Sequence, residues 1–457
     1  MAELDVALGR TLNALLDDKK YTTLQDILIT MNPADIAAIF AELDQARLPL
    51  LYRLLPKELA AETFVEMEPE AQELLIRGFS DVELKEVLNE LYVDDAVDIV
   101  EEMPASVVRR ILRQADPEMR KQINELLRYP DDSAGSIMTT EFVSLRQDMT
   151  VAEAIKRIRR TGIDKETINT CYVTQDKRLI GVVSIRTLLL ADDSEVVSDI
   201  MEENVISVST MTDQEEVVQA LGKYNFTAIP VVDGENRLVG IVTIDDALDV
   251  MEDEATEDIN KMAAILPSDK PYLRQSVFEL WRTRIPWLLL LLLSATFTGI
   301  ILTKFEDALA ARVVLVSFIP MLMGTAGNSG SQASVTVTRA LSLGDIEFRD
   351  LPRIIWKEIR VAVLCGACLA VAAFFKVMLV DHFLMHNLAA TVDVAFTIAT
   401  TVLLIVIMAK VVGCVLPMIG QKLGFDPAVM ATPLISTILD ALSLLVYLTV
   451  AITFLHI

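Results

Sequence analysis

The sequence predicts a multi-domain membrane protein with an all-α N-terminal domain, an α/β pair of repeats, a long connecting helix and a five-helix transmembrane domain. Three observations lead to this prediction. Residues 1–270 contain 54 Asp and Glu against 27 Lys and Arg, whereas residues 271–457 contain 11 against 13. Five long apolar stretches lie in the second part, and an internal repeat lies in the first. Nucleic acid is excluded as a partner, because neutralising phosphates needs clustered Lys and Arg.

Residues 1–131 form the first predicted domain. Stretches such as PADIAAIFAEL and SDVELKEVLNEL space apolar residues by three and four and begin with Pro or Ser-Asp. This pattern is typical of helices, and their succession predicts a helical superhelix that acts as a regulatory or interaction module. The N-terminus lacks the basic-then-apolar order of a signal peptide, so we expect this domain to stay in the cytoplasm.

Residues 132–250 contain the repeat, with units at 137–196 and 200–250. The segment RLIGVVSIRTLL is repeated as RLVGIVTIDDAL. This arrangement resembles a tandem CBS pair, a family whose members often bind adenine nucleotides through a Gly-x-x-Thr/Ser-x-x-Asp pattern. The resemblance makes ATP a candidate regulatory ligand at one site, because the first unit has Thr187 at the Asp position. The residues concerned are Arg186, Phe226, Thr243 and Asp246.

A connecting helix is predicted at 251–275. The segment from 245 to 259 holds eight acidic residues and no basic one. Spacings of three and four stack several carboxylates on one helical face, where like charges repel. An ordinary solvated connector is one interpretation. The other is a switch, in which divalent cations relieve the repulsion and close the protein as the internal cation concentration rises.

The transmembrane domain is predicted at 276–457, because its apolar stretches are long enough to cross the hydrocarbon core. Basic residues before the first stretch, between the second and third, and between the fourth and fifth place the N-terminus inside and the C-terminus outside. We therefore expect a multi-pass protein of the cell membrane, in contact with the lipid bilayer. The predicted spans are 285–303, 313–338, 361–380, 394–418 and 427–457.

Asp440 is a carboxylate within the fifth apolar stretch. A charge in the bilayer is costly and usually faces a water-filled path or the interior of a helix bundle. The alternative is a neutral carboxyl, or one paired with Lys410 or Lys376 for structural reasons.

The second stretch contains PMLMGTAGNSGSQAS at 320–334, whose Gly and Pro residues would unwind or crowd a helix. Asn328 and Gln332, one turn apart, favour a polar pore wall. Close packing through small residues is the alternative. Mg²⁺ suits such a path, because it prefers oxygen ligands and usually keeps several of its waters.

Taken together, these parts resemble the MgtE family of magnesium channels, most specifically in GTAGNSGSQ and in DPAVMATPLISTILD at 426–440. The resemblance implies a homodimer with a pore between the subunits, lined by Asp440, Asn328 and Asp426. It also implies that 251–275 is a plug helix and that acids on it and on the N-terminal domain bind regulatory Mg²⁺. These acids are Asp94, Asp95, Asp98, Asp246, Asp249, Asp253, Glu254, Glu257 and Asp258.

The function predicted is that of a Mg²⁺-selective channel for magnesium uptake, closed by Mg²⁺ bound to the cytoplasmic domains. A transporter coupled to H⁺ or Na⁺ is the main alternative, since an intramembrane carboxylate also suits a proton relay. A membrane-bound sensor that transports nothing is a third hypothesis. An enzyme is not expected, because the sequence shows no catalytic triad, hydrolase motif or phosphate-binding loop.

Overall fold

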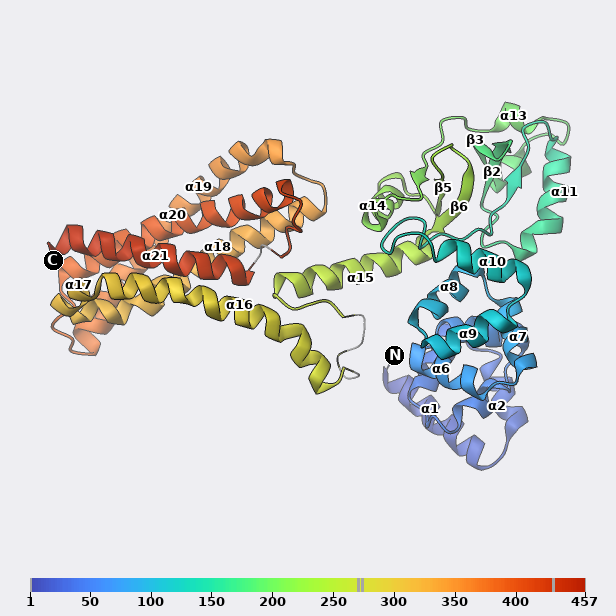
Figure 1. Ribbon diagram of the computed structural model, residues 1–457, viewed down its shortest axis with the longest axis horizontal. Coiled ribbons are helices and arrows are strands. Elements are labelled where there is room, and N and C mark those ends of the chain that lie inside the picture. The colour runs from blue at the N-terminus through green and yellow to red at the C-terminus, as the bar shows by residue number, and fades with distance from the viewer. Residues whose placement is uncertain (1, 269–271, 273–274, 430–431, 457) are drawn as a thin grey trace. The chain divides into compact units, whose positions relative to one another are not determined.

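The computed structural model describes residues 2–268, 272, 275–429 and 432–456, and it divides into two compact units, Met1–Met251 and Glu252–Ile457. We call these the N-terminal unit and the membrane unit. The predicted fold class is confirmed: a helical domain, a pair of α/β repeats, a connecting helix and a helical region with five candidate spans follow one another along the chain (Figure 1).

The N-terminal helices stack in a staggered order, because helix pairs such as α3 and α5, α5 and α7, and α7 and α9 pack against each other. Their starts are fixed locally by capping side chains: the Ser80 hydroxyl accepts from the Glu83 N–H, and Asn32 and Asp116 cap α3 and α10. The helices are α1 (Ala2–Asp17), α2 (Tyr21–Leu28), α3 (Pro33–Ala41), α4 (Leu48–Tyr52), α5 (Lys57–Val65), α6 (Pro69–Gly78), α7 (Asp81–Glu90), α8 (Val93–Glu102), α9 (Ala105–Gln114) and α10 (Pro117–Leu126).

The two repeats have the same topology. In each, a short strand pairs in parallel with a second strand, which pairs antiparallel with a third, giving the orders β1-β2-β3 and β4-β5-β6. The elements of the first are β1 (Ser144–Leu145), α11 (Val151–Thr161), η1 (Gly162–Asp164), β2 (Thr170–Gln175), β3 (Arg178–Ser184), α12 (Ile185–Leu190) and α13 (Val197–Ile200). Those of the second are β4 (Val208–Ser209), α14 (Gln214–Tyr224), β5 (Ala228–Val232) and β6 (Leu238–Thr243).

The segment at the start of each repeat pairs with the sheet of the other repeat. Thr139 exchanges backbone hydrogen bonds with Ile241 on β6, and Glu202 exchanges them with Val182 on β3. The crossing segment passes so close that a Cβ on Gly240 would lie 2.7 Å from the Thr139 carbonyl oxygen. The glycine shared by the two repeated sequences is therefore required by the way the two units interlock.

The connecting helix α15 (Ile244–Met262) starts directly at the end of β6, within the second repeat. Its first residues belong to the N-terminal unit, and the residues from Glu252 onward belong to the membrane unit. Of the segment predicted as helix at 251–275, residues 263–268 follow α15 as a turn and an irregular stretch, and 269–271 and 273–274 lie outside the described residues.

The membrane unit contains five helices long and apolar enough to cross a membrane: Val277–Lys304, Val313–Ser342, Phe348–Leu384, Val392–Lys422 and Pro433–Leu455. Their elements are α16 (Val277–Lys304), α17 (Glu306–Ala311), η3 (Val313–Phe318), α18 (Ile319–Ser342), η4 (Phe348–Asp350), α19 (Leu351–Phe375), the π-helical η5 (Lys376–Leu384), α20 (Val392–Lys422) and α21 (Thr432–Leu455). Helices α18, α20 and α21 contact one another and form the centre, whereas α16 buries none of its residues within the chain.

The glycine-rich segment of the second span does not unwind, contrary to one expectation from the sequence. Helix α18 runs unbroken through it, and the glycines instead allow close helix packing. A Cβ on Gly413 of α20 would clash with the carbonyl oxygen of Gly330. The backbones of α18 and α20 therefore approach each other at a point where no side chain fits between them.

Candidate ion pathway and regulatory carboxylates

Asp440 lies on α21 about two turns after the start of that helix, beside α18. A Cβ on Gly330 would touch the Leu439 side chain, and one on Gly327 would lie 3.6 Å from the Ser436 hydroxyl. These contacts bring the glycine-rich part of α18 to the same level as the turn of α21 that precedes Asp440. The two features that the sequence singled out separately are thus neighbours in the fold.

The Asp440 carboxylate is half-buried and makes no hydrogen bond or ion pair with any described residue. The two lysines considered as partners pair elsewhere. Lys376 Nζ lies 2.9 Å from Asp381 Oδ2, and Lys410 Nζ lies 3.9 Å from Glu358 Oε2. Structural pairing of Asp440 with either lysine is therefore ruled out within the described part of the chain.

Asn328 and Gln332 point away from the packed core of α18. Both are exposed, whereas Gly327, Ser329 and Gly330 next to Asn328 are buried. Amide groups facing hydrocarbon without a hydrogen-bond partner are costly. This face therefore requires water or a second protein surface, which is what a pore between subunits provides.

The N-terminal unit contains a compact group of carboxylates at the start of α8. The Val93 N–H at that helix start donates to Glu141 Oε2 at 3.4 Å, and the Glu166 N–H donates to the Glu141 carbonyl at 3.0 Å. Asp94 and Asp95 occupy the same first turn of α8. Three segments distant in sequence thus bring their acids together, and Asp246 on α15 comes from a fourth, since its charge acts on Asp94, Asp95 and Glu166. We call Asp94, Asp95, Glu141, Glu166 and Asp246 the first cluster.

Burial and mutual repulsion raise the pKa values of these acids. Burial, reinforced by the charge of Asp246, raises the pKa of Asp95 to about 7, and burial with the neighbouring carboxylates raises that of Glu166 to about 8. The pKa of Asp94, only 9% exposed, is also raised well above its ordinary value by burial and by Asp95. Asp94 Oδ1 and Glu166 Oε2 are buried and accept no hydrogen bond from described residues. Such oxygens are satisfied by a cation or a proton.

A second cluster lies at the far end of α15, within the membrane unit. Lys261 Nζ lies 2.7 Å from Asp426 Oδ2, in the turn between α20 and α21, and also contacts the Glu257 carboxylate. The other Asp426 oxygen accepts from the Ala428 N–H at 2.8 Å. The Ser342 hydroxyl at the end of α18 donates to Asp258 Oδ2 at 3.3 Å. This second cluster (Glu257, Asp258, Lys261, Ser342 and Asp426) joins the connecting helix to two spans.

Charges in the second cluster are partly balanced. Burial lowers the pKa of Lys261, but hydrogen bonds to Asp426 and Glu257 outweigh it, so the pKa is raised overall. Burial and the charge of Asp426 raise the pKa of Asp258, which has no basic partner at ion-pair distance among the described residues. The structure joins Asp426, which the sequence predicted for the pore, to the connecting helix through Lys261; its role in the pore stays a prediction.

The nine acids predicted as one regulatory group do not all come together: Asp94, Asp95 and Asp246 belong to the first cluster, Glu257 and Asp258 to the second, and Asp98, Asp249, Asp253 and Glu254 to neither. Burial raises the pKa of Asp246 against the opposing hydrogen bond from Thr243, and the charges of Asp245 and Asp249 add to the rise. Asp98, Asp249 and Asp253 are exposed, and Glu254 is half-buried. Within the described residues no three His, Cys, Asp or Glu side chains form a preassembled metal centre. The first cluster suits a hydrated Mg²⁺, which needs only one or two carboxylates and keeps its waters.

Sequence reasoning did not identify Glu141, Glu166, Lys261 or Ser342. Glu141 and Glu166 lie in loops whose sequence carries no periodicity, so nothing distinguishes them from solvated surface acids. Lys261 is the first base after the acidic run, which was the only available signal for it.

The predicted nucleotide residues are partly brought together. The Thr243 hydroxyl donates to Asp246 Oδ2, and the equivalent pair in the first repeat, Ser184 and Thr187, is joined at 2.8 Å. Phe226 stacks on Tyr224 with ring centroids 5.5 Å apart, and the Ile244 N–H next to Thr243 donates to the Thr227 carbonyl beside Phe226. Arg186 is exposed on the other repeat, and no hydrogen bond or ion pair links it to these groups in the described part of the chain.

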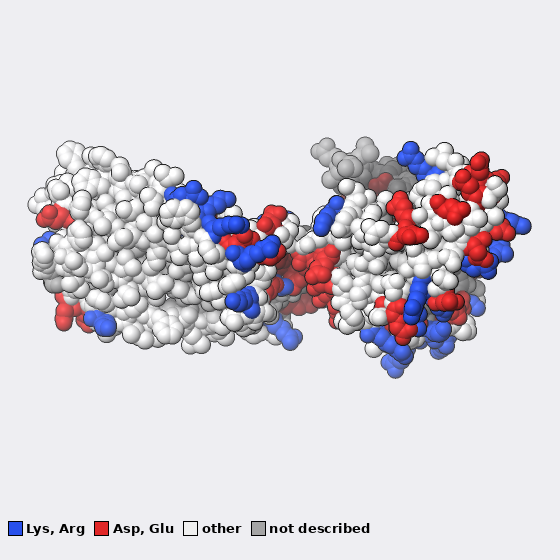
Figure 2. Space-filling model, turned by 90° about the horizontal axis from the view of Figure 1, so that it is seen from above, with Lys and Arg blue, Asp and Glu red and all other residues white. Residues whose placement is uncertain are grey.

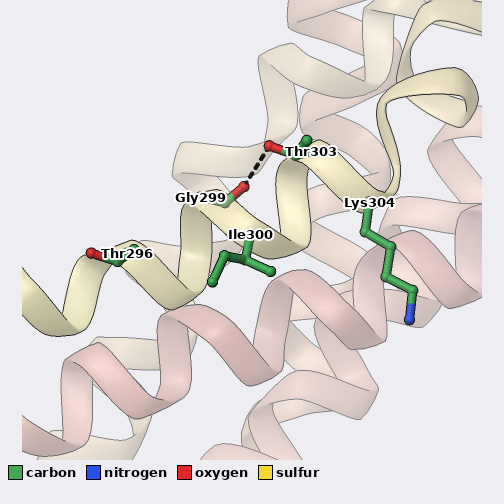
Figure 3. Close-up of a pocket in the computed structure, with 5 residues that line it drawn as sticks. All are labelled: Thr296, Gly299, Ile300, Thr303 and Lys304. Atoms are coloured by element: carbon green, nitrogen blue, oxygen red, sulfur yellow. Dashed lines mark hydrogen bonds between the residues drawn. The ribbon is translucent and has the colours of Figure 1, made fainter.

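One hollow on the membrane unit, of about 540 Å³, lies along the last turns of α16. Figure 3 shows its lining, in which the Thr303 hydroxyl donates to the Gly299 carbonyl at 3.0 Å and Lys304 extends from the helix end. All the lining residues come from this one peripheral helix: Thr296, Gly299, Ile300, Thr303 and Lys304. A groove with a single wall does not form an ion pathway. The region around Asp440 therefore stays the candidate pathway.

Family models match most of the chain. The MgtE model, described as a divalent cation transporter, matches residues 319–450, and the model of the MgtE intracellular N domain matches 31–132. The CBS domain model matches twice, at 134–194 and 197–253.

Two similar proteins extend over nearly the full length. The magnesium transporter MgtE of Thermus thermophilus is 38% identical over 453 residues, which are 98% of this chain and 98% of that protein. The magnesium transporter MgtE of Bacillus subtilis is 34% identical over 444 residues, covering 97% and 96%.

Two solved structures resemble the N-terminal part. The cytosolic domain of the Mg²⁺ channel MgtE in complex with ATP is 39% identical, with a TM-score of 0.51, over 53% of this chain and 99% of that one. The soluble part of a magnesium transporter is 34% identical, with a TM-score of 0.51, over 56% and 100%.

Proposed function

Because this chain belongs to the MgtE family of divalent cation transporters, we propose that it is a Mg²⁺ channel for magnesium uptake. The observation that carries the proposal is Asp440: a carboxylate on a spanning helix, without an ion pair among the described residues, beside the polar segment of α18. A carboxylate in that setting attracts a cation from water. Mg²⁺ can pass while keeping several of its waters, so a wide polar path suffices.

The exposed amide face of α18 supports a pore built by two copies of the chain. Asn328 and Gln332 are left exposed by the described part of the chain, and α18 and α21 lie side by side. In a two-fold symmetric homodimer the same surface of each subunit faces its partner. We propose that two copies of Asp440 and Asn328 line one pathway, with the N-terminus in the cytoplasm and the C-terminus outside.

We further propose that cytoplasmic Mg²⁺ closes this channel through the first cluster. Repulsion among Asp94, Asp95, Asp246 and Glu166 opposes the packing of α8 against the start of α15, and a bound divalent cation relieves it. A ligand shifts a conformational equilibrium only when it binds one state better. Here the closed state, with the carboxylates together, is the one that binds.

ATP is a candidate ligand of the second repeat, at Thr243, Asp246 and Phe226. Two things support this proposal: the ATP bound to the similar cytosolic domain, and the position of Phe226 beside Thr243. Asp246 belongs to the first cluster as well. Nucleotide and Mg²⁺ would therefore act on the same carboxylate, so the binding of one would change the affinity for the other.

The test is Mg²⁺ flux into proteoliposomes with a fluorescent Mg²⁺ indicator inside. Asp440→Asn keeps the shape and removes the charge, and we expect flux to fall at least tenfold while the protein still elutes as a single species. Asp393→Asn, an exposed acid at the start of α20, is the matched control and should keep full flux. Normal flux through Asp440→Asn would overturn the pore assignment.

The same vesicles separate a channel from a coupled transporter. A channel carries Mg²⁺ at a rate set by its own gradient, whereas a coupled transporter stops when the H⁺ and Na⁺ gradients are abolished. We expect flux to persist with an ionophore present and no Na⁺ on either side. Its loss under those conditions would favour coupling.

A further inference from the structure

The start of the third span extends beyond the hydrocarbon core. The continuous helical stretch Phe348–Leu384 has 37 residues, which is about 55 Å at the rise of an α-helix, against about 30 Å of hydrocarbon. The apolar run at 361–380 is by itself long enough to cross. The preceding residues, 348–360, therefore lie at the level of the lipid headgroups.

Two faces of this headgroup-level segment differ sharply. Leu351, Ile354 and Ile355 pack against the cluster formed by Cys414 and Met418 of α20. On the opposite face Arg353, Trp356, Lys357 and Arg360 are exposed. Their spacing of three and four places them in a single stripe along α19. We call these four residues the basic stripe.

The charges of the basic stripe are largely uncompensated. Arg353 pairs with Asp350 at 3.2 Å, but its side chain is 88% exposed, so this pair contributes little. Lys357 has no acidic partner among the described residues, and Arg360 lies over the Trp356 ring with its Cζ 5.9 Å from the centroid. The other acid of this segment, Glu358, lies on the side of the helix that faces Lys410, with its Oε2 3.9 Å from Lys410 Nζ.

The basic stripe borders a hollow of about 420 Å³ lined by Arg349, Asp350, Pro352 and Arg353. In Figure 2 Lys and Arg gather at one end of the membrane unit, while most of the face seen in this view carries no charge. Each Lys or Arg next to a membrane strengthens the binding of anionic lipids by a factor of about five. Trp is favoured at the same depth, because its ring is apolar and its N–H is polar.

We propose that the basic stripe is a binding site for the phosphate headgroup of an anionic phospholipid. The phosphate lies among the Arg353, Lys357 and Arg360 cations, and the glycerol and upper acyl region lie against Trp356. The site fixes the cytoplasmic end of α19 at the membrane surface. It is independent of the proposed ion pathway, because none of its residues belongs to α18 or α21.

The chain contains three Trp residues, which allows a direct optical test. Trp281→Phe and Trp287→Phe leave Trp356 as the only indole in the full-length protein, which is then reconstituted in phosphatidylcholine vesicles. Phosphatidylglycerol brominated near the headgroup end of its acyl chains is added at a low mole fraction, and brominated phosphatidylcholine is added in parallel. We expect half-maximal quenching of Trp356 fluorescence at a mole fraction of brominated phosphatidylglycerol at least fivefold lower than that of brominated phosphatidylcholine.

Replacing Arg353, Lys357 and Arg360 by Gln should bring the ratio of these two mole fractions to about one, so that the preference for the anionic lipid is lost. The matched control is Arg109→Gln, Lys121→Gln and Arg128→Gln, which removes three exposed charges from the N-terminal unit and should leave the preference unchanged. Millimolar inorganic phosphate should not reverse the quenching. Competition by phosphate would mean a soluble-anion site and would overturn the lipid assignment. Equal quenching by the two lipids would overturn it as well. So would no quenching by either lipid, as expected if a second copy of the chain covers the stripe.

If the Phe substitutions prevent folding, the protein with its native Trp residues provides a second measurement. Phosphatidylglycerol added to the detergent-purified protein should raise its melting temperature more than phosphatidylcholine does. The Gln triple variant should lose that difference while the control triple variant keeps it. An equal response of the two triple variants would contradict the proposal.

Discussion

Lys261 provides the sharpest test of how the connecting helix is held. Its ammonium contacts two carboxylates, Glu257 and Asp426, with side-chain exposures of 25% for Lys261 and 34% for Asp426. Hydrogen bonds between charged groups contribute about 1.5 to 3 kcal/mol when buried, and exposed ion pairs less than about 1. At this intermediate exposure Lys261→Gln should cost about 1 to 2 kcal/mol, which is a factor of 5 to 30 in the docking of the end of α15.

Hydrogen–deuterium exchange of the full-length protein, measured by mass spectrometry in detergent, reports that docking directly. Amides in the 252–262 part of α15 exchange at a rate set by the fraction of time the segment is open. In EDTA we expect Lys261→Gln to speed their exchange by about tenfold. With Mg²⁺ at millimolar concentration the difference should shrink, because the freed carboxylates can then bind the metal ion instead.

Two variants make the result specific. Lys261→Arg keeps the charge and should exchange nearly as the original protein does, and Lys85→Gln removes an exposed charge on α7 and should change nothing at 252–262. Unchanged exchange in Lys261→Gln in EDTA would refute the reasoning. So would an equal increase in Lys261→Gln and Lys261→Arg.

Two further predictions concern stability. Gly413→Ala places a methyl group against the Gly330 carbonyl and should cost about 1 to 3 kcal/mol of stability, measured as a lower melting temperature. Gly299→Ala, with open space around it, should not lower the melting temperature, and equal melting temperatures of the two variants would contradict the packing. Because the pKa values of Asp95 and Glu166 are raised to about 7 and about 8, these two groups hold more protons in the folded N-terminal unit than in the unfolded chain. Their contribution to its stability is therefore fully present below about pH 4 to 4.5 and is lost as pH rises through about 7 to 8. The melting temperature of the isolated N-terminal unit in EDTA should therefore fall from pH 6 to pH 8.5, and Mg²⁺ should restore it. A melting temperature that rises with pH would contradict this prediction.

The spans and the repeat could be predicted because each depends on a pattern that is local in the sequence. Nineteen uncharged residues at 285–303 are explained by the bilayer alone, and the Gly240 motif is recognisable because Gly181 repeats it. The state of α18 could not be predicted in the same way. Its glycines are equally compatible with unwinding and with close packing, and only the position of Gly413 on another helix decides between them.

The regulatory acids show the same limit. The sequence identified the acidic run, because charge density is visible without a fold, whereas the acids of α8 followed only from the resemblance to the MgtE family. It did not identify Glu166, whose position in the first cluster depends on a hydrogen bond from its backbone to Glu141. It also did not separate the two ends of α15, since the base that balances the second cluster follows the acidic run by only three residues.

The two clusters differ in a way that assigns them different roles. Asp246 and Lys261 both lie on α15, the first in the N-terminal unit and the second in the membrane unit. Four acids of the first cluster, Asp94, Asp95, Glu166 and Asp246, have raised pKa values and form no ion pair with a basic residue in the described part of the chain, so their packing depends on an external cation or proton. The second contains its own cation in Lys261. Metal sensitivity should therefore reside mainly in the first cluster, while the second holds α15 to the membrane unit whether or not Mg²⁺ is present.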